Sequence, residues 1–367
     1  MKKIFALVLT LCMVFALAAP AYADGSDVRV AMITDYGDIT DQSFNQTTYE
    51  ACKEYCEANG IEFKYYKPGS DSDEDRISSI EDAIDENFNV VVMPGYAFGA
   101  AIRATAPEYS DVTFVALDVS DFDLGVQDGF ELPANLYSAV YQEELCGYMA
   151  GYAAVKLGYT KLGFLGGMAV PAVVRYGYGF VQGADAAAAE IGADVTMNYA
   201  YGNQFYGDAD ITAAMDTWYG AGTEVVFACG GGIFTSAAEA AAKVGGKVIG
   251  VDVDQAATID GLYGEGMTVT SAMKGLAATV KTVLASIVDG KFEGGKVENL
   301  GLVSEKPEEN YVQLAGSTQF GDGFTADDYA ALVSDMISGK VTVSNDTTVA
   351  AADNAKTITV NDLGNLK

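Results

Sequence analysis

The most informative segment of the chain reads Ala31-Met-Ile-Thr-Asp-Tyr-Gly-Asp-Ile-Thr-Asp-Gln-Ser-Phe-Asn-Gln46. An apolar run over residues 28–33 leads to Asp35, a short polar turn follows, and a helical pattern begins at Ser43. This order predicts a strand that enters a helix through a loop rich in hydrogen-bonding side chains. In an open parallel sheet, such loops lie at the carboxyl ends of the strands, where ligands bind.

The same alternation of apolar runs and helical stretches continues along the chain. We expect strands at residues 28–34, 90–94, 112–118, 161–166, 195–200, 224–229, 247–253 and 267–271. We expect helices at residues 43–58, 73–87, 98–109, 136–157, 175–191, 210–220, 233–244, 275–289 and 326–338. Near-continuous apolar strands separated by helices predict an α/β fold with parallel sheet covered on both faces.

This series of units fits either one barrel or two doubly wound sheets. The irregular, acidic segment 120–133 divides the pattern, and the alternation restarts after it. A length of 367 residues also favours about two domains. We therefore expect two sheets.

The first residues have the features of a secretory signal. Lys2 and Lys3 precede an apolar stretch over residues 4–19, and a small-x-small site follows at residues 21–23. We predict a signal peptide over residues 1–23 and an exported protein. A membrane anchor is the disfavoured alternative, because the apolar run is short for a bilayer span.

Composition excludes several classes of function. A formal charge of −30 repels phosphate backbones, so nucleic acid is not an expected partner. The chain has no histidine, which removes the commonest general base and transition-metal ligand. We expect no metal site and no cofactor. We interpret the four cysteines after the signal as small buried residues; they are Cys52, Cys56, Cys146 and Cys229.

Three of the expected strands lead directly to an aspartate: Asp35, Asp118 and Asp252. Parallel strands place such carboxylates along one edge of a sheet, facing the crevice. Vicinal sugar hydroxyls are donors that suit a carboxylate, and charge-assisted bonds are about twice as strong as neutral ones. The pattern favours a ribose-like partner, whereas the alternative is that each aspartate caps its own loop.

Aromatic side chains and a lone cation follow the same strands. Phe44 falls in the first turn of the first helix, while Phe205 and Tyr206 follow a strand of the second half. A ring from each half could enclose a flat base, and stacking of this kind contributes about 1–3 kcal/mol per base. The segment 230–232 is all glycine, which lets a backbone approach a ligand closely. Lys274 follows another strand, and its positive charge could balance the negative charges of the aspartates.

Several motifs resemble the basic membrane protein family, substrate-binding proteins of ABC importers whose best-known type is a purine nucleoside receptor. The motifs are the opening segment, Glu144-Leu-Cys-Gly-Tyr-Met-Ala-Gly-Tyr-Ala-Ala154, Gly163-Phe-Leu-Gly-Gly167, Gly179-Phe180 with Gly183, Gly250-Val-Asp-Val-Asp-Gln255 and Thr270-Ser-Ala-Met-Lys274. The resemblance covers roughly residues 28–307.

The resemblance implies a type I periplasmic-binding-protein fold, with two doubly wound lobes joined by a three-crossover hinge and a ligand between them. It places the first lobe at residues 27–135 and 256–300, and the second at 136–255 and 301–345. The tail, residues 346–367, either packs as a strand or hangs loose.

The resemblance also implies roles for individual residues. Asp35 and Asn45 would bond the base, which would stack between Phe44 and either Phe205 or Tyr206. The ribose would be held by Asp118, Asp252 and Lys274, with backbone from Gly231 or Gly232. The chain departs from many relatives in lacking a lipoprotein cleavage site and in the spacing of residues 202–208.

We therefore expect a non-enzymatic, monomeric binding protein on the periplasmic or extracellular face, which delivers a purine nucleoside to an ABC permease. One alternative is a receptor for a sugar or small signal on the same fold. The less favoured alternative is a nucleoside hydrolase, in which the acidic loop 35–41 would hold calcium.

Overall fold

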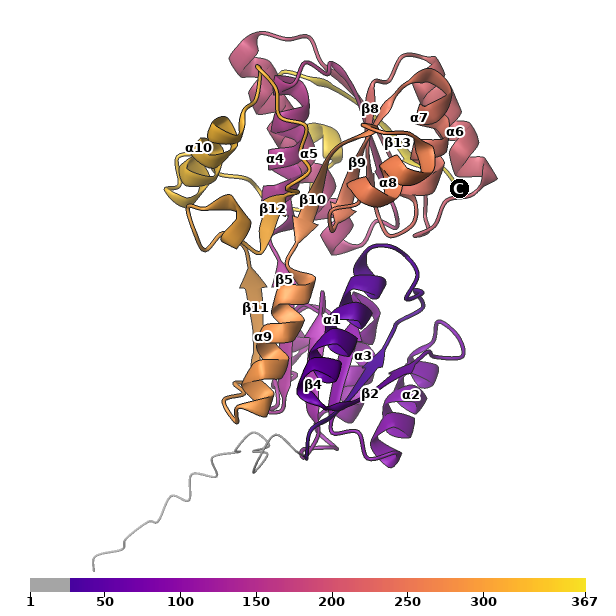
Figure 1. The fold of residues 1–367 in the computed structure, drawn as a ribbon, viewed down its shortest axis with the longest axis vertical. Helices are drawn as coiled ribbons and strands as arrows, with labels where there is room; N and C mark the ends of the chain where they lie inside the picture. Colours follow the sequence, from indigo (N-terminus) through magenta and orange to yellow (C-terminus); the bar gives the residue numbers. More distant parts are fainter. Residues whose placement is uncertain (1–26) are drawn as a thin grey trace, which may run out of the picture.

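Two parallel-sheet lobes lie one above the other and are joined by three connecting segments in the computed structural model, which describes residues 27–367 (Figure 1). The lower sheet has the strand order β11-β5-β4-β3-β1-β2, and the upper sheet has the order β12-β10-β9-β8-β6-β7-β13. All pairs are parallel except β10 with β12. The prediction of two doubly wound sheets is confirmed.

The first lobe carries helices on both faces of its sheet. Helices α1 and α9 cover one face, and α2 and α3 cover the other. The strands are β1 (Arg29–Ile33), β2 (Glu62–Tyr66), β3 (Val90–Pro94), β4 (Thr113–Leu117), β5 (Leu136–Tyr141) and β11 (Lys296–Leu300). The helices are α1 (Phe44–Asn59), α2 (Asp73–Asp85), α3 (Gly99–Thr105) and α9 (Leu276–Val288).

The second lobe is built in the same way, with α4 and α5 on one face and α6, α7 and α8 on the other. Its strands are β6 (Lys161–Gly166), β7 (Thr196–Tyr201), β8 (Val225–Cys229), β9 (Lys247–Asp252), β10 (Thr268–Lys274), β12 (Val312–Leu314) and β13 (Thr359–Asn365). Its helices are α4 (Glu143–Lys156), α5 (Pro171–Ile191), α6 (Ala209–Gly220), α7 (Phe234–Val244), α8 (Ala256–Tyr263) and α10 (Ala326–Ile337).

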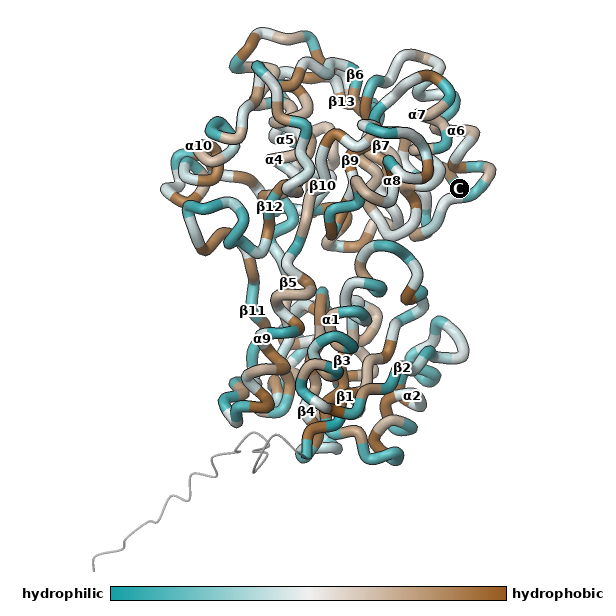
Figure 2. Tube along the Cα trace, viewed as in Figure 1, coloured by the Kyte–Doolittle hydropathy of each residue, from teal (hydrophilic) through white to brown (hydrophobic). Residues whose placement is uncertain are grey.

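The central strands are apolar on both faces because helices cover them on both sides. All residues of β3, β4 and β8 are buried. The exposed edge strand β2 is more polar than the central strands of its sheet, and Figure 2 shows hydrophobic residues concentrated in the interior of both lobes. The four cysteines are buried, as predicted, and they form no disulfide; they are Cys52, Cys56, Cys146 and Cys229.

The lobe boundaries differ from the predicted ones. The chain leaves the first sheet after β5, returns to it after β10, and crosses again after β11. Residues 136–141 therefore belong to the first lobe, because the Asn135 amide donates to three backbone carbonyls of that lobe and β5 pairs with β4. Residues 256–274 belong to the second lobe, because β10 pairs with β9.

Some elements differ from the expected pattern. The predicted helix at 136–157 is strand β5 followed by helix α4, since a six-residue apolar run beside a helix has no distinguishing periodicity. Strands β2, β11 and β12 and helix α8 were not predicted. The tail packs as a strand, because β13 pairs with β7.

Within residues 27–367, no helix has both the length and the apolar character that crossing a bilayer requires. The predicted signal peptide, residues 1–23, lies outside the described residues.

Helices α4 and α5 pack backbone against backbone through glycines. A Cβ atom on Gly147 would overlap the carbonyl oxygen of Tyr176, and one on Gly183 would overlap that of Tyr148. The contact places the start of α4 beside α5, which brings charged residues of both helices to the hinge.

We expect Gly183→Ala to lower the free energy of unfolding by about 1–3 kcal/mol, because the added methyl group must push the two helices apart. Gly220→Ala is the matched control, since a Cβ there meets nothing within 4 Å. Urea unfolding of the three proteins measures the difference. Equal losses in both variants would contradict the close packing.

Candidate ligand-binding site

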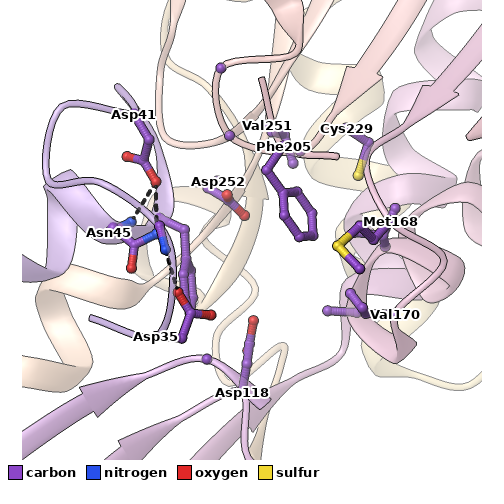
Figure 3. A pocket seen from close by; sticks show the side chains of 18 of the residues that line it. Asp35, Asp41, Asn45, Asp118, Met168, Val170, Phe205, Cys229, Val251 and Asp252 are labelled. Carbon is purple, nitrogen blue, oxygen red and sulfur yellow. Dashed lines mark hydrogen bonds between the residues drawn. The ribbon is translucent and has the colours of Figure 1, made fainter. Parts of the chain in front are cut away.

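A cavity of about 660 Å³ lies between the lobes, at the carboxyl ends of strands from both sheets. Figure 3 shows Asp35, Asp41 and Asn45 on one side and Met168, Val170 and Cys229 on the other. One wall is therefore polar and the facing wall largely apolar. A volume of this size is within the range of small-molecule sites.

All the candidate residues predicted from the sequence line this cavity. They are Asp35, Phe44, Asn45, Asp118, Phe205, Tyr206, Gly231, Gly232, Asp252 and Lys274. The structure thus brings together residues that span the chain from its first strand to its tenth. Their contacts with a ligand stay a prediction.

Two of the strand-end aspartates have an unusual backbone conformation. Asp118, directly after β4, has φ 59°, and Asp252, the last residue of β9, has φ 66°. Non-glycine residues in this left-handed region cost of the order of 1–3 kcal/mol and cluster at functional sites. In both cases the turn aims the carboxylate at the cavity, where Figure 3 shows the two acids.

Lys274 joins these acids across the lobes. Its Nζ lies 2.5 Å from Asp118, 3.5 Å from Glu143 and 3.6 Å from Asp252. The lysine is buried, and Asp118 comes from the first lobe whereas the other three residues come from the second. Burial lowers the pKa of Lys274, but the neighbouring carboxylates outweigh it, and the pKa is raised overall. The lysine stays charged.

Arg175 extends the cluster on the second lobe. Its Nε lies 2.7 Å from Glu143 and 4.0 Å from Glu144. Two cations therefore face four buried or nearly buried carboxylates, so the cluster carries excess negative charge. Burial raises the pKa of Asp118 to about 6 and that of Glu144 to about 7, against the pull of Lys274 and Arg175 respectively.

The raised pKa of Glu144 predicts a pH effect on stability. The folded state holds a proton that the unfolded state releases, so wild-type stability falls as the pH rises from about 4.5 to about 7. The Glu144→Gln side chain does not titrate, so its free energy of unfolding does not fall in this way. Between the two pH values, the stability of the variant relative to wild type should rise by the order of 2–3 kcal/mol. Urea unfolding at pH 5 and pH 7.5 measures the gain. The exposed Glu265→Gln is the control, and an E144Q difference that does not change with pH would refute the effect.

The polar wall is organised by the loop before α1. Both oxygens of Asp41 accept backbone N–H groups at the start of α1, and Asp41 also accepts from the Asn45 amide nitrogen at 3.1 Å. The Asn45 Oδ1 is buried and has no hydrogen-bond partner among the described residues. Asn45 is thus fixed by its nitrogen, with its oxygen left to accept a bond.

Asp35 is in part a loop cap. Its Oδ1 accepts the N–H groups of Tyr36 and Gly37 at 2.6 and 2.8 Å. Burial raises its pKa against these two donors. The same carboxylate lines the cavity and belongs to its polar wall. Capping and ligand binding are therefore compatible here.

Each lobe contributes an aromatic ring to the lining of the cavity. Phe44 lies under Lys274, whose Nζ is 4.7 Å from the ring centre. Phe205 points into the cavity from the second lobe (Figure 3). Its ring lies against that of Tyr36 of the first lobe, with ring centres 6.3 Å apart. Tyr206 is 63% exposed at the rim. Of the two candidates for the second ring, Phe205 is the inner one.

The glycine segment supports the same wall. Gly231 has φ 51°, which favours glycine, and the Gly232 N–H donates to the Phe205 carbonyl at 2.9 Å. The N–H of Gly232 is therefore already bonded within the protein.

Direct bonds between the lobes close the cavity. Ser43 Oγ donates to Asp252 at 2.7 Å, the Gln255 amide donates to the Gln42 carbonyl at 3.1 Å, and the Tyr36 hydroxyl lies 3.5 Å from the Met168 sulfur. Each bond has one partner in each lobe. These contacts hold the two lobes together around the cavity.

Sequence reasoning missed the residues that support the site, namely Tyr36, Glu143, Met168, Arg175 and Tyr176. The sequence contains a signal that could have identified two of these residues, Glu143 and Arg175. Glu143 and Arg175 are charges at the starts of otherwise apolar, glycine-containing helices, and buried charges of this kind are paired.

Fold and cavity together define a two-lobed binding protein of the type I periplasmic class. The chain belongs to the family described as "ABC transporter substrate-binding protein PnrA-like", which matches it over residues 28–314. The predicted resemblance is confirmed.

Individual relatives agree with this assignment. The chain is 30% identical over 243 residues to "ABC transporter nucleoside-binding protein BmpA" of Lactococcus lactis, an alignment that covers 63% of this chain. The chain spans 65% of that relative's length, just under two thirds. It is also 28% identical to "Basic membrane protein A" of Borreliella burgdorferi, over 70% of this chain and 72% of the relative.

Solved structures share the fold. An ABC transporter solute-binding protein from Conexibacter woesei aligns with a TM-score of 0.66 at 24% identity, over 87% of this chain and 99% of that one. A solute-binding protein from Aeropyrum pernix aligns with the same TM-score at 20% identity, over 89% of this chain and 90% of that one.

Proposed function

We propose that this protein is the exported, monomeric substrate-binding component of an ABC importer and that it binds a purine nucleoside between its lobes. The observation that carries the proposal is the convergence of three strand-end carboxylates, one buried lysine and two rings on a single cavity. The family supplies the transport role, and closure of the lobes over ligand is the signal a permease would recognise.

The free acceptors of the cavity match the donors of a nucleoside. Asp118 Oδ1 is buried without a hydrogen-bond partner among the described residues. The carboxylate of Asp252 lies 3.6 Å from Lys274 Nζ, the atom that also pairs with Asp118. Ribose hydroxyls would donate to these carboxylates, and Lys274 would donate to a ribose oxygen. Asn45 Oδ1 and the Asp35 carboxylate would accept hydrogen bonds from the edge of the base.

The rings supply the remaining contact. Phe44 comes from the first lobe and Phe205 from the second, so a flat base would lie between them only when the lobes are together. The printed names of relatives include a nucleoside-binding protein, which agrees with this chemistry. The hydrolase alternative has less support, because Asp38 and Asp41 of loop 35–41 already bind their own loop, a lysine and the start of α1.

A competition experiment tests the proposal. Protein refolded from urea is incubated with an equimolar mixture of guanosine, inosine, adenosine, cytidine, ribose, xylose and glucose, then desalted and denatured. We expect mass spectrometry of the released fraction to find a purine nucleoside. Release of a sugar, or of none of the seven compounds, would overturn the proposal. Free hypoxanthine formed from inosine would instead indicate the hydrolase.

A further inference from the structure

The last part of the chain lies beyond the residues that match the family. Residues 341–367, which we call the strap, run around the second lobe and end beside α6, where Figure 1 marks the end of the chain. Nothing in the proposed function uses the strap.

The strap is anchored first on helix α5. The Gln182 side chain exchanges two hydrogen bonds with the backbone of Ser344, and the Tyr178 hydroxyl donates to the Val349 carbonyl at 2.7 Å. Further along, Asp185 accepts the N–H groups of consecutive strap residues. Ile358 is buried in the main core. The strap is thus part of the folded lobe.

Its last strand then follows β7 toward the cavity. β13 pairs with β7 from Thr359 opposite Thr196 to Asn365 opposite Tyr201, and the Leu366 N–H donates to the Tyr201 carbonyl at 2.8 Å. The loop that carries Phe205 begins directly after β7. The strap therefore reaches the base of this loop, residues 202–208.

Lys367 ties the loop on both sides of Phe205. Its Nζ forms an ion pair with Asp208 and lies 3.4 Å from the Gln204 side-chain oxygen. Gln204 in turn donates to Asp208 and to the Tyr206 carbonyl, each at 2.9 Å. The loop contains Asn203 at φ 58°, a conformation that costs energy and needs such support.

We propose that Lys367 is a positioning residue, which holds loop 202–208 so that Phe205 forms one wall of the cavity. The strap then contributes to ligand affinity without touching the ligand. This inference rests on the proposed function only where it concerns affinity, because the order of the loop can be measured without any ligand.

The first test is hydrogen exchange of the unliganded protein. Lys367→Glu places a like charge beside Asp208 and Asp210, and we expect the amides of residues 202–208 to exchange at least about threefold faster. Lys356→Glu is the matched control, since it makes the same charge change at an exposed strap lysine. Unchanged exchange in K367E would overturn the proposal, whatever the ligand proves to be.

The second test is a mutant cycle on affinity. We expect K367E to weaken nucleoside binding roughly two- to fivefold, with K367R and K356E close to wild type. In a Phe205→Ala background, K367E should have no further effect, because the side chain it positions is gone. Equal effects of K367E with and without Phe205 would contradict a role through that ring.

Discussion

Lys274→Met is expected to lower the free energy of unfolding by about 3–5 kcal/mol at pH 7.5 and to abolish ligand binding. The change leaves Asp118, Glu143 and Asp252 buried around a methionine that cannot balance their charge. The measurement is urea unfolding together with calorimetric titration of nucleoside.

The loss should be smaller at pH 5 than at pH 7.5. The pKa of Asp118 is already raised to about 6 with the lysine present, and it rises further once the lysine is removed. At pH 5 the folded variant therefore takes up protons and relieves the repulsion. Lys281→Met is the control, because Lys281 forms an exposed ion pair with Glu54. It should change the free energy of unfolding by less than about 1 kcal/mol. Equal stability of K274M and wild type would mean that the cluster is not held by this lysine.

Phe205→Ala should weaken nucleoside binding by about 10- to 100-fold, the effect expected from losing one face of base stacking. Phe205 faces the cavity and lies against Tyr36, whereas its neighbour Tyr206 is 63% exposed. Tyr206→Ala is therefore the matched control, with an expected change below about threefold. Titration of both variants decides between the two rings. A larger effect of Y206A than of F205A would reverse their assignment.

The features that could be predicted from the sequence are local ones. An apolar run leading to aspartate is visible in six residues, and parallel strands bring such ends to one edge whatever the rest of the chain does. Asp35, Asp118 and Asp252 were found in this way, and the structure places all three on the cavity. Phe44 followed from the start of α1.

What could not be predicted depends on tertiary contacts. The sequence of strand β5 resembles the start of α4, and only its pairing with β4 and β11 assigns it to the first lobe. The return to the first lobe was predicted too early, because β10 pairs with β9 of the second lobe. Glu143 and Arg175 join the site only because α4 and α5 pack through glycine. No local pattern in the strap indicated that Lys367 reaches Asp208.

Calorimetric titration of the refolded protein with guanosine, inosine, adenosine and cytidine tests the central claim most directly. We predict saturable binding of at least one purine nucleoside at one site per chain, and loss of that heat in K274M. Absence of heat with all four nucleosides would contradict the claim that the acids and rings between the lobes form a nucleoside site.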